Sequence, residues 1–464
     1  SFIGHPKRHP AAIKRKIGAK RDGRVLAVET SILSDAGAYA YLSPRVLFQM
    51  VGHATGPYVV PNVKTDGIVV YTNNTPTSAF RGFGKPQAQF AAEVQMGELA
   101  RELGMDPLDL RLKNILRTGS TTATGQLLDH SVGLEETLIR AAEAANWRMR
   151  DRAQSSQGGK RRGMGLACVY HGTSIGPLGV DTGSAIIFVE ADGTVVVKTG
   201  LTEYGQGLHT GLAQIAAEVI GIPLTKVRVD LPDTDVVLDS GPTVASRGLF
   251  MGGSATKIAA EKIRQKLCKA ASEILNCPED EVDIKNAKAF WKQNESKSVS
   301  IEELAKVSAK QGIELREEGW FHNRSTNWNR EAGQGSPWIS YSFATHIAEV
   351  EVDMETGKVD VVRYIAAHDV GKAVNPILLK GQIYGGVVQG LGYALTEDVI
   401  QENGRILNPN LTDYYIPTTC DVPEKIVSIL VEHEFKAGPF GAKGMGEVPI
   451  EPVAGAVATL YLTP

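Results

Sequence analysis

Glu447 is a carboxylate in a stretch whose residue types suit catalysis. Glycines at 441, 444 and 446 lead up to it, and prolines at 449 and 452 follow it. Glycine allows tight turns and close backbone approach, whereas proline fixes φ and removes a hydrogen-bond donor. The stretch therefore predicts a rigid turn that presents Glu447 as a candidate general base. Taken alone, a glycine-rich turn with an exposed glutamate is the simpler interpretation.

Four other glycine-bearing stretches could supply a ligand for that base: 79–84, 203–210, 243–253 and 386–392. The first three precede predicted helices, where free backbone N–H groups can bind an anion. Residues 79–84 do not match the G-x-G-x-x-G dinucleotide fingerprint. In the fourth stretch, close helix packing explains the glycines about as well as a ligand role for Gln389.

Taken together, the five stretches predict one large, buried, phosphate-bearing cofactor that is contacted from several segments. A glycine-rich structural protein would explain the turns but not Arg81, Gln206 and Glu447. Side chains predict no metal site. His5 and His9 have i, i+4 spacing, but the adjacent prolines oppose the helix that would align them.

Composition excludes several classes of protein. The 464 residues are 42% hydrophobic and 22% charged, as in ordinary globular proteins, and the net charge of -3 predicts no nucleic-acid partner. No apolar run is long enough to span a membrane. The four cysteines form no C-x-x-C pair, which argues against a cysteine-ligated iron–sulfur or zinc site and fits a reducing cytoplasm.

The elements that must position these stretches alternate between strand and helix. We predict a β-rich region over 11–80, a boundary at 150–162 and an α+β unit after it. The individual expectations are strands at 24–31, 67–72 and 226–231, hairpins at 186–198 and 346–363, and helices at 87–103, from 106, and at 209–220, 254–275, 300–312 and 382–395.

In the same order along the chain, five motifs resemble the molybdopterin-binding part of the xanthine dehydrogenase/aldehyde oxidase family. They are Ala79–Gly84 with Pro86-Gln87, Gly205–Thr210, Thr243–Gly253, Gly386–Gly392 and Gly444–Pro449. The resemblance implies an α+β fold with two successive molybdopterin-binding subdomains: 1–150, the C-terminal part of the first, and 151–464, the second. It also implies a molybdenum hydroxylase with a sulfurated molybdenum centre, whose molybdopterin would be the cytosine dinucleotide form in a bacterium.

The resemblance also implies roles for single residues. Glu447 corresponds to the family's catalytic glutamate, which deprotonates a metal-bound hydroxide, and we expect partial burial to raise its pKa toward the working pH. Phe83 resembles an aromatic side chain that stacks on a flat substrate. The expected cofactor contacts are Phe80, Arg81, Gly205, Gln206, Gly207, Ala245, Ser246, Arg247 and Gln389. Because the family's metal is held by the cofactor's sulfur atoms, no protein ligand to it is expected.

Two departures from the family predict partner chains. The chain lacks the N-terminal segment of the family's molybdenum portion, and its start at Ser1-Phe2 without methionine gives it the look of an internal piece. We therefore expect either that another chain supplies this segment or that the sequence omits it. Since no iron–sulfur or flavin segment is present, the electrons would leave through a 2Fe-2S subunit and an FAD subunit.

Arg45 bears on the small-molecule substrate. It resembles the arginine with which purine-oxidising members orient the ring, and a guanidinium can stabilise charge that develops on a heterocycle. Ile175 stands where those members have a second phenylalanine. The loop at 79–84 has no cysteine, which argues against a copper-bridged carbon monoxide dehydrogenase. We favour a xanthine- or hypoxanthine-type purine. An aldehyde oxidoreductase and a non-catalytic scaffold subunit are the alternatives.

Overall fold

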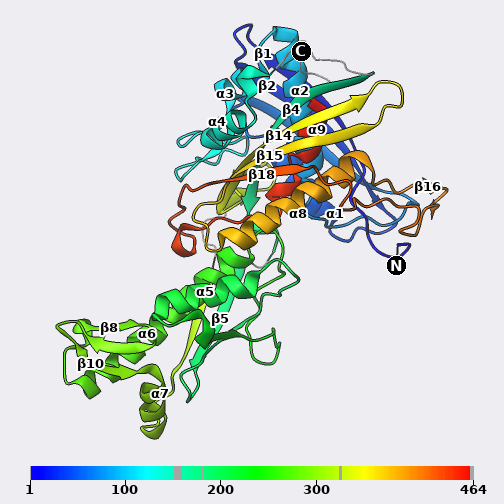
Figure 1. Cartoon of the computed structure of the whole chain (residues 1–464). Helices are drawn as coiled ribbons and strands as arrows, with labels where there is room; N and C mark the ends of the chain where they lie inside the picture. The colour runs from blue at the N-terminus through cyan, green and yellow to red at the C-terminus, as the bar shows by residue number, and fades with distance from the viewer. Residues whose placement is uncertain (1, 151–158, 180, 323–326, 460–464) are drawn as a thin grey trace.

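The structure is a computed structural model that describes residues 2–150, 159–179, 181–322 and 327–459. Its fold is mixed α+β, which confirms the predicted class. Figure 1 shows a larger lobe and a smaller lobe, the latter coloured green and formed by the middle of the chain. No helix among the described residues combines the length and apolar character needed to cross a membrane.

A four-stranded sheet forms the centre of the larger lobe. Its spatial order is β18 (Lys425–Val431), β15 (Val359–Asp369), β14 (Ser340–Asp353), β4 (Lys160–Thr173). Strand β14 pairs antiparallel with both neighbours, and β15 and β18 are parallel. The predicted hairpin at 346–363 is confirmed by the β14–β15 pair.

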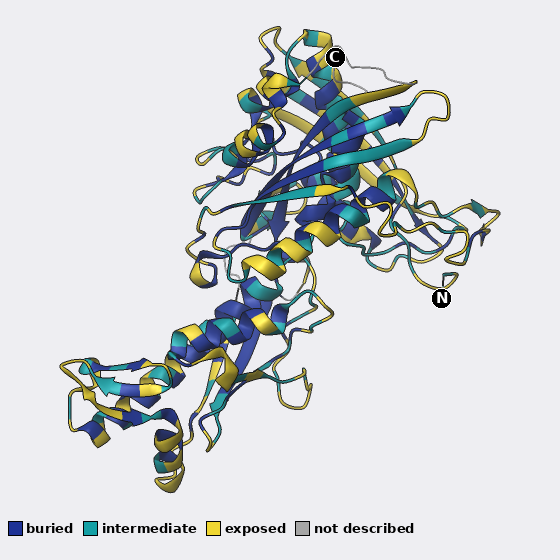
Figure 2. Cartoon of the chain, in the orientation of Figure 1, coloured by how far each residue is buried: buried dark blue, intermediate teal, exposed yellow. Residues whose placement is uncertain are grey.

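Both faces of this sheet are buried, because successive side chains of a strand point to opposite sides. Cys168 and Tyr170 pack into one core with helices of the first 150 residues, and Ala167 and Val169 pack into another with α8 and α9. Figure 2 shows this burial as a dark blue sheet. The bounds of the two C-terminal helices are Pro376–Leu395 for α8 and Val453–Ala458 for α9.

The first 150 residues supply three strands and four helices within the described range. A three-stranded sheet has the order β1-β2-β3, and helix α1 connects the parallel pair β2 and β3. Helix α2 confirms the prediction over 87–103, and Asp106 caps α3 by accepting a hydrogen bond from the Leu108 N–H. The bounds are β1 Ala11–Ala19, β2 Val25–Gly37, α1 Ser43–Gly52, β3 Asn62–Tyr71, α2 Lys85–Leu103, α3 Pro107–Asn114 and α4 Leu134–Ala144.

The smaller lobe packs two helices on a sheet of order β11-β5-β6-β7, with a three-stranded sheet and a short helix beyond them. Strands β5 and β6 confirm the predicted hairpin at 186–198. The bounds are β5 Thr182–Val189, β6 Val195–Thr199, α5 Leu208–Ile220, β7 Val227–Val229, α6 Gly253–Leu275, β8 Val282–Lys285, β9 Lys288–Trp291, β10 Asn294–Ser300, α7 Ile301–Lys310 and β11 Arg316–His322. Short strands elsewhere are β12 Asn327–Asn329, β13 Gln334–Ser336, β16 Gln401–Glu402 and β17 Arg405–Ile406.

Some boundaries differ from the sequence predictions. Helix α8 begins at Pro376, six residues before the predicted start, because the Asn375 side chain caps it by accepting from the Leu378 N–H. Helices α1 and α4 were not predicted. Part of the predicted boundary segment, residues 151–158, lies outside the described residues. Because one core joins residues 25–147 to the central sheet, the division into two units at residue 150 stays a prediction.

Candidate active site

The five glycine-bearing stretches meet at one cavity of about 590 Å³. It lies where the smaller lobe, with its loops before α5 and α6, meets the start of α8 and the loop that carries Glu447. Phe83 and every predicted cofactor contact line this cavity. The side chains and loops that line it include Phe80, Arg81, Tyr204, Gln206, Ser246, Gln389 and Glu447.

Glu447 is held at the cavity wall from three sides. Its Oε1 accepts a hydrogen bond from the Gly82 N–H (3.1 Å), and its Oε2 accepts one from Ser246 Oγ (3.3 Å). The Glu447 N–H donates in return to Ser246 Oγ (3.0 Å). His171 Nε2 lies 3.3 Å from Oε2, and the Glu447 side chain is 12% exposed. The carboxylate is therefore fixed in orientation and still reachable from the cavity.

The expected increase in the pKa of Glu447 is wrong. Burial does act to raise the pKa, but the hydrogen bond and positive charge of His171, the charge of Lys85 and the Gly82 N–H lower it to about 2. This effect could not be predicted from the sequence, because His171 and Lys85 are distant from Glu447 in the chain. The carboxylate is ionised throughout the neutral range.

A buried polar cluster lies behind Glu447, and sequence reasoning missed it. His171 Nδ1 lies 2.6 Å from Glu451 Oε1, and Gln89 Nε2 donates to Glu451 Oε2 (2.8 Å). Lys85 Nζ lies 3.5 Å from His171 Nε2. His171 and Glu451 are fully buried side chains. The available signal was Glu451 itself, the second carboxylate in the Glu-x-x-x-Glu spacing that begins at Glu447.

Arg81 ties the loop at 79–84 to the other stretches. Its Nε donates to the Gly446 carbonyl (2.7 Å), and its Nη1 donates to Gln389 Oε1 (3.2 Å). Its Nη2 donates to the carbonyl and side-chain oxygens of Gln382 (3.2 and 3.3 Å). These bonds join the loop to α8 and to the residue before Glu447. In this arrangement the guanidinium shapes the cavity wall.

Arg8, which sequence reasoning also missed, holds the same loop from outside. Its guanidinium lies 4.7 Å from the Phe80 ring centroid and 4.8 Å from that of Tyr393. Its Nη2 donates to the Arg81 carbonyl (2.7 Å). Cation–π contacts and a charged hydrogen bond thus hold the loop at 79–84 in place, so that the Gly82 N–H points at the Glu447 carboxylate.

In the loop before α5, the backbone N–H groups bind the carboxylate of Glu203, a residue of the same loop. Glu203 Oε1 accepts from the N–H groups of Gly205 (2.7 Å) and Gly207 (3.0 Å), and Oε2 accepts from the His209 N–H (3.0 Å). Burial acts to raise the pKa of Glu203, but these N–H groups lower it further than burial raises it. Gln206 is bonded within the loop, to the Tyr204 N–H and the Thr202 carbonyl.

The loop before α6 contains backbone conformations that side chains rarely adopt. Ala245 and Ser246 have φ of 59° and 53°, in the left-handed region. Such conformations cost free energy and cluster at functional sites. Arg247 has a fully buried side chain, and its guanidinium donates to the carbonyls of Thr182 and Pro242 and to that of Ser240. It stabilises the loop from behind, while Ser246 contacts Glu447.

Helix α8 fits both interpretations of its glycines. A Cβ at Gly386 would press on Pro449, and one at Gly390 would press on Val453. Close packing on the segment after Glu447 therefore requires glycine at both positions. Gln389, one turn along, lines the cavity and accepts the hydrogen bond from Arg81.

The two predicted substrate contacts lie in different places. Phe83, with φ of 50°, lines the cavity. Arg45 is exposed on α1 and is not among the cavity-lining residues. Arg45 and Ile175 both lie close to Gly179: a Cβ added to this glycine would be 3.7 Å from Arg45 Nη1 and 3.1 Å from Ile175 Cγ2. Arg45 and Ile175 thus lie near each other, around Gly179, but neither lines the cavity.

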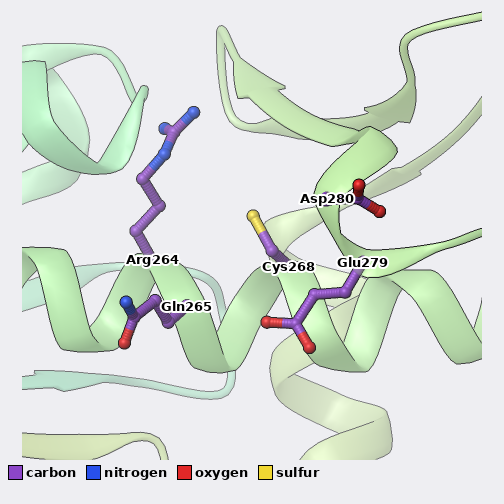
Figure 3. Close-up of a pocket in the computed structure, with 5 residues that line it drawn as sticks. All are labelled: Arg264, Gln265, Cys268, Glu279 and Asp280. Atoms are coloured by element: carbon purple, nitrogen blue, oxygen red, sulfur yellow. The ribbon is translucent and has the colours of Figure 1, made fainter.

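A second hollow, of about 480 Å³, lies in the smaller lobe (Figure 3). Its walls are Arg264, Gln265 and Cys268 of α6, with Glu279 and Asp280 opposite. Burial raises the pKa of the Cys268 thiol, which lowers its reactivity as a nucleophile. No predicted stretch reaches this hollow. Across the described ranges, no three His, Cys, Asp or Glu side chains gather as a metal cluster.

Comparisons with known proteins give the family. Two models, both described as the molybdopterin cofactor-binding domain, match residues 140–423 and 1–115. The xanthine dehydrogenase molybdenum-binding subunit of Escherichia coli O157:H7 is 32% identical over 465 residues, which are 98% of this chain and 60% of that subunit. This chain belongs to the molybdopterin-binding proteins of the xanthine dehydrogenase family.

Other members of the family share the fold over nearly the whole chain. The aldehyde oxidoreductase of Megalodesulfovibrio gigas is 31% identical over 96% of this chain and 46% of its own length. The crystal structure of quinoline 2-oxidoreductase from Pseudomonas putida 86 superposes with a TM-score of 0.87 at 28% identity, over 99% of this chain and 60% of the other. The chain thus spans less than two thirds of the length of these relatives.

Proposed function

We propose that this chain is the molybdopterin-binding part of a molybdenum hydroxylase that inserts a water-derived oxygen at an electron-poor carbon of an N-heteroaromatic compound. A purine of the xanthine or hypoxanthine type is the favoured substrate. The observation that carries the proposal is the ionised Glu447 carboxylate, fixed by Gly82 and Ser246 in the cavity where all five stretches meet.

The residues around the cavity fit a molybdopterin group. The volume is within the range of small-molecule sites, and several of the lining residues are glycines. Two of these glycines differ in their surroundings. Gly444 is packed against the protein, since an added Cβ would clash with the Ser246 carbonyl, whereas Gly205 borders open space, since an added Cβ would meet nothing within 4 Å.

Phe80, Ala245 and the other predicted contacts would hold the cofactor. The N–H groups of Gly205 and Gly207 already donate to Glu203, so these two glycines would serve by letting the cofactor come close to the backbone.

The chain's own residues would position and accept a proton. The bound cofactor supplies the molybdenum centre that activates oxygen and accepts two electrons. Glu447 accepts a proton from the attacking oxygen, and its bonds to Gly82 and Ser246 keep the free lone pairs of the carboxylate directed at the cavity. Phe83 offers a ring face to a flat substrate.

Replacing Glu447 by glutamine in the assembled enzyme tests the proposal. The molybdenum and pterin contents should match those of the wild type, and turnover should fall by about a hundred- to ten-thousand-fold, the usual contribution of a positioned base. Glu355→Gln, at an exposed turn, is the matched control. Full activity of the Glu447→Gln enzyme would refute the proposal. A native complex without molybdenum would instead indicate a scaffold subunit.

Aldehyde oxidation by the same site is the second candidate, favoured by the position of Arg45 outside the cavity wall. Assaying purines, quinoline-type heterocycles and small aldehydes side by side separates the two. Under the purine proposal, Arg45→Ala lowers turnover of purines far more than that of aldehydes. Equal effects on both classes would remove Arg45 from substrate recognition.

The partners and the cofactor form complete the proposal. We propose molybdopterin cytosine dinucleotide as the cofactor, with electrons passing to a 2Fe-2S subunit and an FAD subunit in the cytoplasm. A further chain or segment would supply the N-terminal molybdopterin-binding part. Acid release of CMP from the purified complex, together with its iron, flavin and subunit content, tests these assignments.

A further inference from the structure

His171 connects two carboxylates that differ in their access to the cavity. Glu447 reaches the cavity, whereas Glu451, one helical turn further along the chain, is 1% exposed. The imidazole lies between them, with Nδ1 2.6 Å from Glu451 Oε1 and Nε2 3.3 Å from Glu447 Oε2. The ring comes from the end of β4, so the central sheet fixes its position relative to both glutamates.

Two contacts favour protonation of both ring nitrogens. An ionised carboxylate only accepts hydrogen bonds, so Nδ1 donates to Glu451, and a proton on Nε2 faces Glu447 at 3.3 Å. Lys85 Nζ is the competing donor at Nε2 but lies further away, at 3.5 Å, so we infer an imidazolium. Charge balance within the cluster agrees, since Lys85 and an imidazolium at His171 match the two carboxylates, Glu447 at the cavity wall and Glu451 in the interior. A neutral ring would leave the buried Glu451 carboxylate without the cation that it contacts at 2.6 Å, which is costly.

We propose that His171 is a positioning residue: as an imidazolium anchored by Glu451, it keeps Glu447 ionised and directs its free lone pairs into the cavity. This inference deepens the proposed function and rests on it for the role of Glu447 as a base. The ring does not contact the cavity, and it acts through Glu447.

The burial of the cluster also determines where the proton goes. His171, Glu451, Lys85 and Gln89 each have at most 1% exposure, so they offer no route to solvent. A proton that Glu447 accepts must therefore leave through the cavity. The cluster serves as a fixed counter-charge and not as a proton relay.

The other charged groups around the cluster do not replace His171. Lys85 adds a positive charge near both glutamates, and Arg8 and Arg81 act on Glu447 from the outer side. His53 is neutral, because its Nδ1 bonds to the Gln49 carbonyl and its Nε2 accepts from the Gly172 N–H (3.2 Å).

Tyr204 lines the same cavity as Glu447. Burial raises the pKa of its phenol, and the negative charge of Glu447 raises it further. The pKa of His171 is raised because Glu451 and Glu447 together outweigh burial and the charge of Lys85, both of which lower it.

Two measurements on the full chain without cofactor test the proposal. Nitrogen-15 NMR of labelled histidine should show both ring nitrogens of His171 protonated at neutral pH, with assignment by loss of the signals in His171→Gln. Carbon-13 NMR of labelled glutamate carboxyls, assigned with Glu447→Gln, should show Glu447 ionised down to the lowest pH at which the chain stays folded.

In His171→Gln the carboxyl of Glu447 should titrate at a pH higher by about 1–3 units, the usual effect of one adjacent opposite charge. Glu451→Gln keeps an acceptor for His171 Nδ1 but removes the negative charge that stabilises the imidazolium. It should therefore raise the pKa of Glu447 as well. If His171→Gln does not fold, this variant provides the test. His346→Gln, at another buried histidine of the central sheet, is the matched control and should leave Glu447 unchanged.

A neutral His171 ring at neutral pH, or an unshifted Glu447 in the folded variants, would overturn the proposal. In the assembled enzyme, the acid limb of the pH–rate profile should move upward in Glu451→Gln, with the molybdenum content unchanged. Because the NMR readouts need no cofactor, they stand or fall independently of the proposed function, which metal analysis and the Glu447→Gln assay test separately.

Discussion

Replacing Glu447 by glutamine should destabilise the chain at neutral pH and have little effect in acid. A pKa of about 2, against 4.5 for an unperturbed glutamate, is worth about 3 kcal/mol of folding free energy, since each pKa unit is worth about 1.4 kcal/mol. Because the folded-state pKa is depressed, this stability is fully present above pH 4.5 and is lost as the pH falls toward 2.

The glutamine variant cannot recover this stability through its own hydrogen bonds. If its carbonyl oxygen accepts from Gly82, its NH2 group can donate to Ser246 Oγ but lies against the protonated Nε2 of His171, which then loses its acceptor; a buried donor without a partner costs about 1–3 kcal/mol. Urea unfolding of wild type and variant, from neutral pH down to about pH 3, measures the difference. Glu355→Gln controls for general effects of the substitution. A difference that does not change with pH would refute the reasoning.

Three further substitutions test the scaffold around the site. Gly444→Ala should lower the free energy of unfolding by about 1–3 kcal/mol, because its Cβ clashes with the Ser246 carbonyl; an unchanged thermal midpoint would contradict this. Lys443→Met should cost about 3–5 kcal/mol in urea, since it leaves Asp369 buried without its 2.6 Å ion-pair partner; a neutral result would mean that water replaces the lysine. Arg8→Met should cost about 1–2 kcal/mol and lower pterin retention, measured by fluorescence of the released pterin, and full retention would contradict its role in holding the loop.

The sequence located the site better than it described its chemistry. Glycines and prolines around Glu447 act locally, so their consequences for the backbone could be predicted from the chain alone. The same holds for the hairpin at 346–363 and for α2, where local pattern and capping agree with the structure. Helix α8 begins six residues before its predicted start, because the Asn375 side chain caps it.

The pKa of Glu447 could not be predicted from the sequence, because it depends on residues brought together by the fold. Lys85 belongs to the first turn of α2 and His171 to the end of β4, and neither has a motif that points to Glu447. Arg8 is likewise distant in the chain from Phe80 and Tyr393, the two rings that it contacts. Anions in these loops were expected to come from a ligand, yet Glu203 provides one from the chain itself.

An ionised base with a pKa near 2 is a weak one, and the proposed function requires a reason for it. Brønsted behaviour favours a base whose pKa lies near the working pH. The same neighbours that depress the pKa also fix the carboxylate, so Glu447 meets the oxygen nucleophile already oriented and charged. A negatively charged cofactor that enters the cavity would oppose the ionised form and raise the pKa of Glu447. Under the proposed function, the low starting pKa that His171 and Lys85 give Glu447 leaves room for such a rise, so that Glu447 stays ionised at neutral pH when the cofactor is bound.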